Sequence, residues 1–60
     1  MRLEGLDVGD YFRLADDVHS PIFKVVRTSK ESKVVACMDT DLNEHIFPKY
    51  AEVEIIKRGD

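Results

Sequence analysis

Two β-branched runs separated by a short polar segment occupy the middle of the chain. Residues 22–28 read Ile-Phe-Lys-Val-Val-Arg-Thr, and residues 33–38 read Lys-Val-Val-Ala-Cys-Met. Valine and isoleucine favour a pleated, half-buried surface, whereas the intervening Ser-Lys-Glu-Ser has nothing to bury and offers hydroxyl groups to a tight turn. The pattern predicts a β-hairpin, over which shorter strands can fold.

Shorter extended segments flank this hairpin, and turn residues separate them. No run has the length of a helix, and turn signals recur about every eight to twelve residues. Residues 48–51 have the length of one 3₁₀ turn before the last strand. The predicted class is all-β, a small five-stranded antiparallel barrel that is closed or nearly closed, with strands at residues 11–14, 22–28, 33–39, 45–47 and 52–57.

The alternation of apolar side chains indicates which strand faces are buried. In the first and last strands, four residues are predicted to point inward: Phe12, Leu14, Val53 and Ile55. The second strand leaves two faces open, Phe23 with Val25 or Ile22 with Val26. In the third strand we favour one inward face over the other, namely Val35 and Cys37 rather than Val34, Ala36 and Met38.

The length bounds the architecture. A chain of 60 residues has room for one domain, which we expect to span residues 1–60. A domain of this size hides only about 60% of the surface that its unfolded form exposes, so its stability is modest. A dimer interface or a larger partner would add to that stability.

The cysteine content and hydropathy suggest a compartment. Cys37 has no second cysteine to pair with, so a disulfide framework is excluded. No window approaches the roughly 20 apolar residues that cross a bilayer, and residues 1–5 lack the apolar core of a signal peptide. A free thiol without an export signal predicts a cytoplasmic protein with no membrane contact.

The charges are unevenly placed, and the hairpin is the only basic part of a chain whose net charge is −3. With Tyr11 and Arg13 facing outward, the cations beside Tyr11 and Tyr50 would suit single-stranded bases and their phosphates. The same cations suit a solvated hairpin whose charges keep edge strands from pairing with other chains, and we favour this second interpretation. The nucleic-acid alternative depends on Arg13, Lys24, Arg27, Lys30 and Lys33.

The sequence offers few groups for a metal site. The candidate ligands are the two histidines with neighbouring acids, that is His19 and His45 with Asp16, Asp17 or Glu44. Their spacing matches no recognised ligand pattern, and zinc needs three or four converging groups. We therefore interpret both histidines as surface residues and expect no metal.

Catalytic groups are equally sparse. Cys37 and His45 are a candidate nucleophile and base, but the apolar run around Cys37 indicates a buried thiol rather than an activated one. Asp16 and Asp17 are adjacent carboxylates on a loop, which favours solvated turn residues over an acid–base pair. We expect no enzyme and no cofactor.

Strand faces that are not part of the core would expose β-branched side chains. Contiguous exposed apolar patches usually mark contact with another protein. The predicted protein-binding residues are Ile22, Val26, Val34, Ile56, Tyr11 and Tyr50.

Two short segments carry a resemblance to known folds. Residues 47–56, Phe-Pro-Lys-Tyr-Ala-Glu-Val-Glu-Ile-Ile, are similar to the 3₁₀ turn and last strand of SH3 domains. Residues 6–12, Leu-Asp-Val-Gly-Asp-Tyr-Phe, resemble the first strand of KOW-type and elongation factor P-like domains. The layout also resembles small uncharacterised phage and bacterial SH3-like proteins. The resemblance covers about residues 6–57 and implies an SH3-like barrel.

These observations together predict a function. We expect a non-catalytic protein–protein interaction module whose ligand is a protein partner or, in a homodimer, a second copy. The resemblance implies an accessory or inhibitory protein of bacterial or phage origin that acts on a larger host machine. The alternative is weak binding of RNA or single-stranded DNA through residues 24–33.

Overall fold

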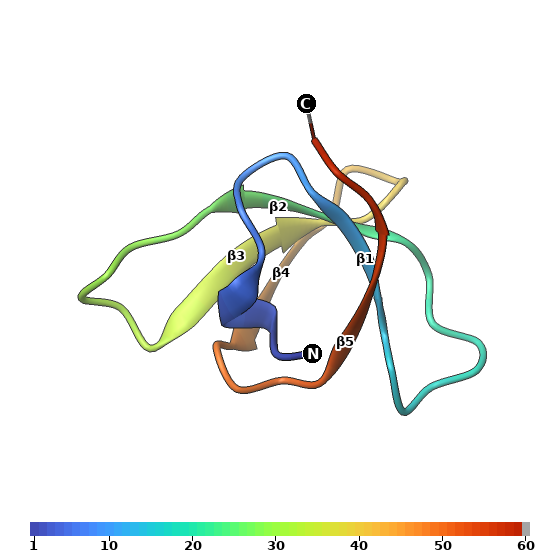
Figure 1. Ribbon diagram of the computed structural model, residues 1–60. Coiled ribbons are helices and arrows are strands. Elements are labelled where there is room, and N and C mark those ends of the chain that lie inside the picture. The colour runs from blue at the N-terminus through green and yellow to red at the C-terminus, as the bar shows by residue number, and fades with distance from the viewer. Residues whose placement is uncertain (60) are drawn as a thin grey trace.

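The computed structural model describes residues 1–59, in which five strands and one short 3₁₀ helix are the regular elements (Figure 1). The strands form one antiparallel sheet in the order β4-β3-β2-β1-β5, so the last strand returns to pair with the first. The predicted all-β class with five antiparallel strands is confirmed. In chain order the elements are η1 (Leu3–Gly5), β1 (Tyr11–Leu14), β2 (Phe23–Arg27), β3 (Val34–Met38), β4 (Glu44–Pro48) and β5 (Val53–Lys57).

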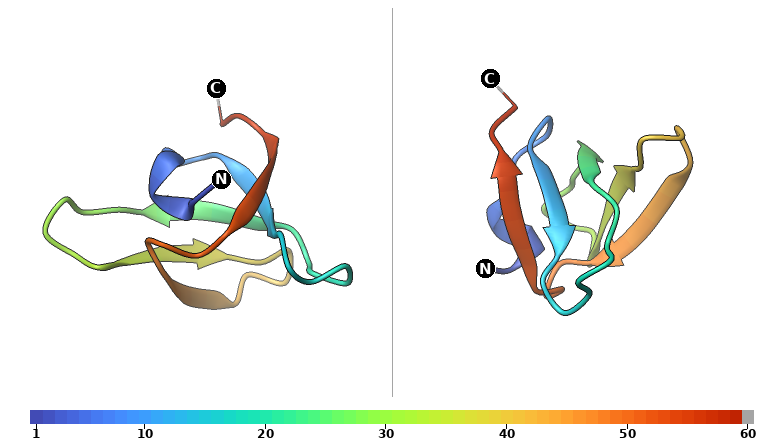
Figure 2. Two further views of the ribbon diagram at one scale, coloured as in Figure 1. Left: turned by 60° about the horizontal axis from the view of Figure 1, so that its bottom comes forward. Right: turned by 90° about the vertical axis from the view of Figure 1, so that its right-hand side faces the viewer.

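The sheet is strongly bent. In the right-hand view of Figure 2 the strands stand side by side in the order of the sheet. The two edge strands, β4 and β5, are close together where the chain connects them and diverge toward their other ends. Because β4 and β5 are the two edges, no ladder closes the barrel between them within residues 1–59. Residues 1–10, which we call the N-terminal arm, protect part of the β5 edge, because Val53 N donates to Met1 O at 2.8 Å.

The 3₁₀ helix η1 precedes the first strand. In η1, Leu6 N donates to Leu3 O at 3.0 Å. Residues 48–51 make the predicted single 3₁₀-type turn before the last strand, because Ala51 N donates to Pro48 O, three residues earlier, at 3.0 Å. The turn does not extend into a helix because the next residue, Glu52, is already paired with Arg2 of the N-terminal arm.

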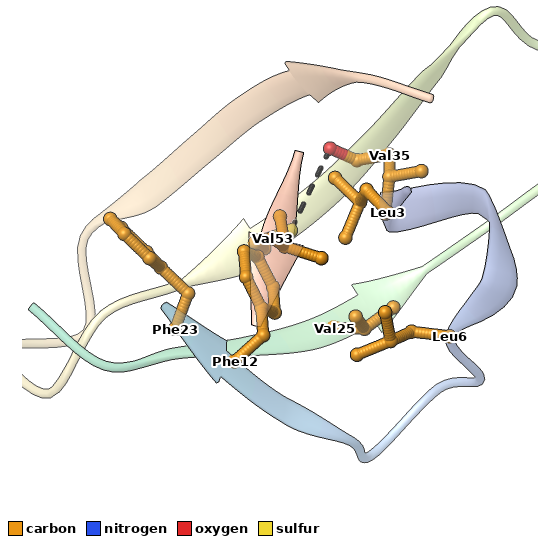
Figure 3. Close-up of a cluster of buried hydrophobic side chains, with 8 residues drawn as sticks. Leu3, Leu6, Phe12, Phe23, Val25, Val35 and Val53 are labelled. Carbon is orange, nitrogen blue, oxygen red and sulfur yellow. Dashed lines mark hydrogen bonds between the residues drawn. The ribbon is translucent and has the colours of Figure 1, made fainter. Parts of the chain in front are cut away.

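The inner side of the bent sheet holds one apolar core (Figure 3). The inward direction predicted for β1, β3 and β5 is confirmed, and Leu14 and Ile55 pack at the margin of the core. In β2 the inward face is the one with Phe23 and Val25. The buried cluster consists of Leu3, Leu6, Phe12, Phe23, Val25, Val35, Cys37 and Val53.

A β-bulge explains why residues 22–28 alternate poorly. Val25 pairs with Cys37 while Arg27 pairs with Ala36, so Val26 is an extra residue in the ladder. A bulge of this kind breaks the period of two, because two residues of one strand oppose one of the other. The ladder ends at Arg27, and the loop at residues 28–33 contains the predicted turn, in which Ser32 N donates to Ser29 O at 3.3 Å.

A buried carboxylate links the turn before β1 to the residues that follow β5. Asp10 is 3% exposed, and its side chain accepts hydrogen bonds from Asp7 N and Gly59 N, each at 2.9 Å. These backbone donors, Asp7 first, and the nearby Arg58 lower the pKa of Asp10. Gly59 approaches Gly9 so closely that a Cβ on Gly59 would lie 2.4 Å from the Gly9 carbonyl carbon, which is why a glycine is needed there.

Candidate protein-binding surface

The outer side of the sheet, opposite the core, carries a band of apolar residues. Residues opposite one another in a ladder point to the same side, and Tyr11 lies opposite Lys24, which lies opposite Met38. This row points outward because Phe12 and Val25, the next residues along β1 and β2, point into the core. The apolar residues of the outer side on β2, β3 and β4 are Val26, Val34, Ala36, Met38, Ile46 and Pro48.

A hollow of about 300 Å³ lies on this side, and we call it the outer groove. Its floor comes from the first three strands, and its far wall is the turn between β3 and β4. The Lys24 ammonium group sits 5.8 Å from the centre of the Tyr11 ring, within the range of a cation–π contact. The groove is lined by Tyr11, Ile22, Lys24, Val26, Met38, Asp39, Thr40 and Leu42.

Asp39 organises the turn that forms this wall. Its Oδ1 accepts hydrogen bonds from Asp41 N at 2.9 Å and Asn43 N at 3.0 Å. Its Oδ2 lies 2.8 Å from His45 Nε2. Its backbone is bonded as well, because Leu42 N donates to Asp39 O at 3.1 Å. Side-chain and backbone bonds from one residue therefore hold the whole turn in a single conformation.

The turn presents Leu42 to solvent in an unfavourable conformation. Leu42 is 76% exposed, and its backbone has a positive φ of 65°. That left-handed region suits glycine or asparagine and is unfavourable for a bulky side chain. An apolar side chain is therefore held in solvent at a strained position, on the rim of an apolar groove. Such strain is often found where a residue serves binding rather than folding.

Acid should loosen this turn. The His45 hydrogen bond, followed by the backbone donor of Asn43, lowers the pKa of Asp39. Because the folded-state pKa is depressed, Asp39 stabilises the fold above its ordinary pKa of about 3.9, and that contribution is lost as the pH falls through the lowered value. In an NMR titration, the amide signals of Asp41 and Asn43 should move together, with a midpoint below the ordinary aspartate value.

The control for this titration is Asp39→Asn, which keeps the shape of the side chain and removes its charge. In this variant the shared transition of the two amide signals should disappear. A shared midpoint at or above the ordinary aspartate value, or a transition that persists in Asp39→Asn, would contradict the assigned role of Asp39.

The outer groove brings together half of the residues predicted to bind protein. Tyr11, Ile22 and Val26 line it. Val34 is on the same outer side, in a second hollow of about 220 Å³ that Ala36 and Ile46 also line. The remaining two residues lie elsewhere. Ile56 falls at the irregularity in the β1–β5 register, between residues paired with Tyr11 and Phe12. Tyr50 is on the turn between β4 and β5.

Sequence reasoning missed three apolar residues of this surface: Met38, Leu42 and Ile46. Met38 was weighed only as a core residue of the less favoured face of its strand. Leu42 sits in a polar turn, where no periodicity marks a lone leucine. Ile46 alternates with His45 and Phe47, whose rings pack on the inner side with centroids 6.0 Å apart, and this alternation was a usable signal.

Three of the predicted nucleic-acid-binding residues, Arg13, Lys24 and Arg27, lie on the outer side of the sheet, and the other two lie on the loop between β2 and β3. Arg13 lies 3.4 Å from Glu54, and Arg27 lies 3.8 Å from Glu44, so carboxylates already pair with both. Lys24 is in the outer groove. Lys30 and Lys33 are exposed on the loop at residues 28–33, and Lys30 borders a different hollow that also contains Glu4 and Asp7.

The remaining candidate groups occupy separate places. His45 bonds to Asp39, while His19 is exposed on the β1–β2 loop. Within residues 1–59 no group of three His, Cys, Asp or Glu side chains could hold a metal ion. Cys37 is buried, and burial raises the pKa of its thiol to about 11, so the thiol stays protonated at neutral pH.

Comparison of the chain with protein-family models, with curated proteins and with solved structures finds no match. Nowhere in residues 1–59 is there a helix long and apolar enough to cross a membrane. The interpretation of the outer groove therefore depends on its own geometry and charge.

Proposed function

We propose that this protein is a non-catalytic protein-interaction module that binds through the outer groove. The observation that carries the proposal is the exposed Leu42 beside an apolar hollow on a rigid turn. Exposed apolar surface that is contiguous and bordered by charge is typical of protein-binding sites. We also propose, on the resemblance to SH3-like proteins, that it is a cytoplasmic accessory or inhibitory protein of bacterial or phage origin.

The energetics favour a protein ligand. Ile22 is 43% exposed, and Leu42 and Ile46 are more exposed still, so each can bury further surface against a partner. Full burial of one such side chain contributes about 1.5–3 kcal/mol. The apolar centre of an interface is surrounded by a polar rim, a role that Lys24, Thr40 and Asp41 can take.

Nucleic-acid binding is supported less well. Phosphate binding draws its affinity from several cations on one continuous surface. In this chain Arg13 and Arg27 are paired with carboxylates. Lys24 covers the Tyr11 ring on which a base would stack.

Photo-crosslinking tests the proposal. A photoreactive phenylalanine analogue at Thr40, which is exposed on the groove rim, is compared with the same group at Val18, which is 83% exposed outside the groove. After irradiation in a bacterial lysate, Thr40 should give protein adducts that Val18 does not. Equal adduct patterns at the two positions would refute the groove as a protein-binding site.

An RNA-binding measurement, combined with the crosslinking, separates protein binding from nucleic-acid binding. A labelled single-stranded RNA should bind the wild-type protein no better than Lys24→Glu, even at low salt. Tight, salt-sensitive RNA binding that is lost in Lys24→Glu, together with RNA adducts at Thr40, would replace the protein-binding proposal with the nucleic-acid one.

A further inference from the structure

We infer that the protein bound in the outer groove is a second copy of this chain, arranged with two-fold symmetry. The inference rests on the proposed protein-binding function and names its partner. In a two-fold interface each residue that contacts a partner residue is contacted by it in return, so one surface must carry both complementary parts. The outer groove does this, because its hollow and its projecting Leu42 are neighbours on one face.

The projecting part fits the receiving part in size and chemistry. The hollow of about 300 Å³ is larger than one leucine side chain, and Tyr11, Ile22, Val26 and Met38 give it apolar walls. A two-fold axis midway between Leu42 and the hollow places each Leu42 in the hollow of the other copy. The bonds from Asp39 hold the turn in place beforehand, so little conformational freedom is lost on binding.

The charges of the two sides are complementary. Lys24 and Lys57, on either side of Tyr11 in one outward row, have no carboxylate within ion-pair distance in residues 1–59. Asp41, next to Leu42, is exposed, and in the same range its carboxylate makes no ion pair. Insertion of Leu42 brings Asp41 toward the basic side of the other copy. Complementary charges of this kind orient an interface.

Pairing through the β4 edge is a less suitable mode of association. Lys49 N donates to Lys33 O at 3.0 Å, and Asp39 N donates to Asn43 O at 3.1 Å. Between these two bonds, successive residues of β4 point their backbone groups alternately toward β3 and away from it. The backbone groups of Glu44, Ile46 and Pro48 therefore face the free edge. Pro48 has no N–H to donate there, and the Glu44 charge opposes burial. Both features protect an edge from strand addition.

The molecule has enough surface for such a dimer. Its total accessible surface is 4280 Å². A standard stable interface takes about 800 Å² from each partner, and weaker, transient ones take less. Because each copy inserts only one projecting apolar side chain, we expect a reversible dimer in the micromolar range or weaker.

Sedimentation equilibrium tests the inference. The weight-average mass of the wild-type protein should rise with concentration toward twice the monomer mass. Leu42→Asn should weaken the dimer by about 100- to 10,000-fold, because two buried leucines are lost per dimer, each worth about 10- to 100-fold. Asparagine tolerates a positive φ, so the variant should unfold at the same temperature or higher. Leu42→Gly is a second such variant, and Val18→Asn is the matched control that should dimerise normally.

A charge exchange tests the arrangement itself. Lys24→Asp and Asp41→Lys should each weaken the dimer, and the double variant should recover the wild-type affinity. A protein that stays monomeric at every concentration overturns the inference, as does dimerisation unchanged in Leu42→Asn and Leu42→Gly. Failure of the double variant to recover affinity overturns the two-fold arrangement. If the monomer still gives Thr40-specific adducts with other proteins, the proposed function survives without the dimer; if it gives none, both fail.

Discussion

Replacing Phe12 with alanine is expected to leave little folded protein. Phe12 is fully buried, and its ring stacks on Phe23 with a centroid separation of 5.6 Å and meets Phe47 edge-on at 6.3 Å. Truncating a buried phenylalanine costs about 3–5 kcal/mol. A single core of this size rarely supplies more than about 3–5 kcal/mol in total. Circular dichroism and chemical denaturation should therefore show loss of the cooperative transition.

The comparison for Phe12→Ala is Tyr11→Ala, one residue earlier on the opposite side of the sheet. Tyr11 lines the outer groove and is half-buried, so its truncation should change stability far less. A Phe12→Ala protein that unfolds at the wild-type denaturant concentration would mean that β1 is turned the other way.

Leu3→Ala should destabilise the protein by about 2–5 kcal/mol. Leu3 is 1% exposed and belongs to the core cluster, although it lies outside the sheet. In Figure 3 it packs beside Val35. Its backbone is fixed by Leu3 N donating to Ala51 O at 2.9 Å. Truncation would leave a cavity where the N-terminal arm covers the inner side of the sheet, and denaturant unfolding measures the loss.

Val8→Ala is the matched control for Leu3→Ala. Val8 belongs to the same arm but is 58% exposed, so its truncation should change the free energy of unfolding by less than about 0.5 kcal/mol. Equal effects of the two substitutions would show that the arm is not part of the core. Phe12→Ala measures how much a core residue of the sheet adds to the free energy of unfolding, and Leu3→Ala, compared with Val8→Ala, measures how much the N-terminal arm adds.

The outer groove combines a hydrogen-bonded turn with an exposed apolar side chain, Leu42. Asp39 holds the turn through Asp41, Asn43 and His45. In the described chain Leu42 is the one non-glycine residue with positive φ, a conformation that is unfavourable for a bulky side chain. Natural sequences depart from local preference mainly at functional sites. This departure supports the proposed role of the turn in protein binding.

Several features of the fold followed from local pattern. The alternation of Phe12 and Leu14 in β1, and of Val53 and Ile55 in β5, indicated the inward side correctly. β2 remained undecided because its bulge at Val26 breaks the period of two. Leu3 and Leu6 were not recognised as core, because a three-residue 3₁₀ helix is too short to produce a period.

The sequence by itself determined the all-β class, the number of strands and half of the buried core, because these depend on alternation and turn residues within a few positions of each other. Tertiary structure decided the rest: the Asp10 bond to Gly59, across 49 positions, and the outer groove, where Tyr11, Met38 and Leu42 meet. These depend on which strands become neighbours. Strand neighbours are set by the packing of the whole sheet around its core, which no short stretch of sequence encodes.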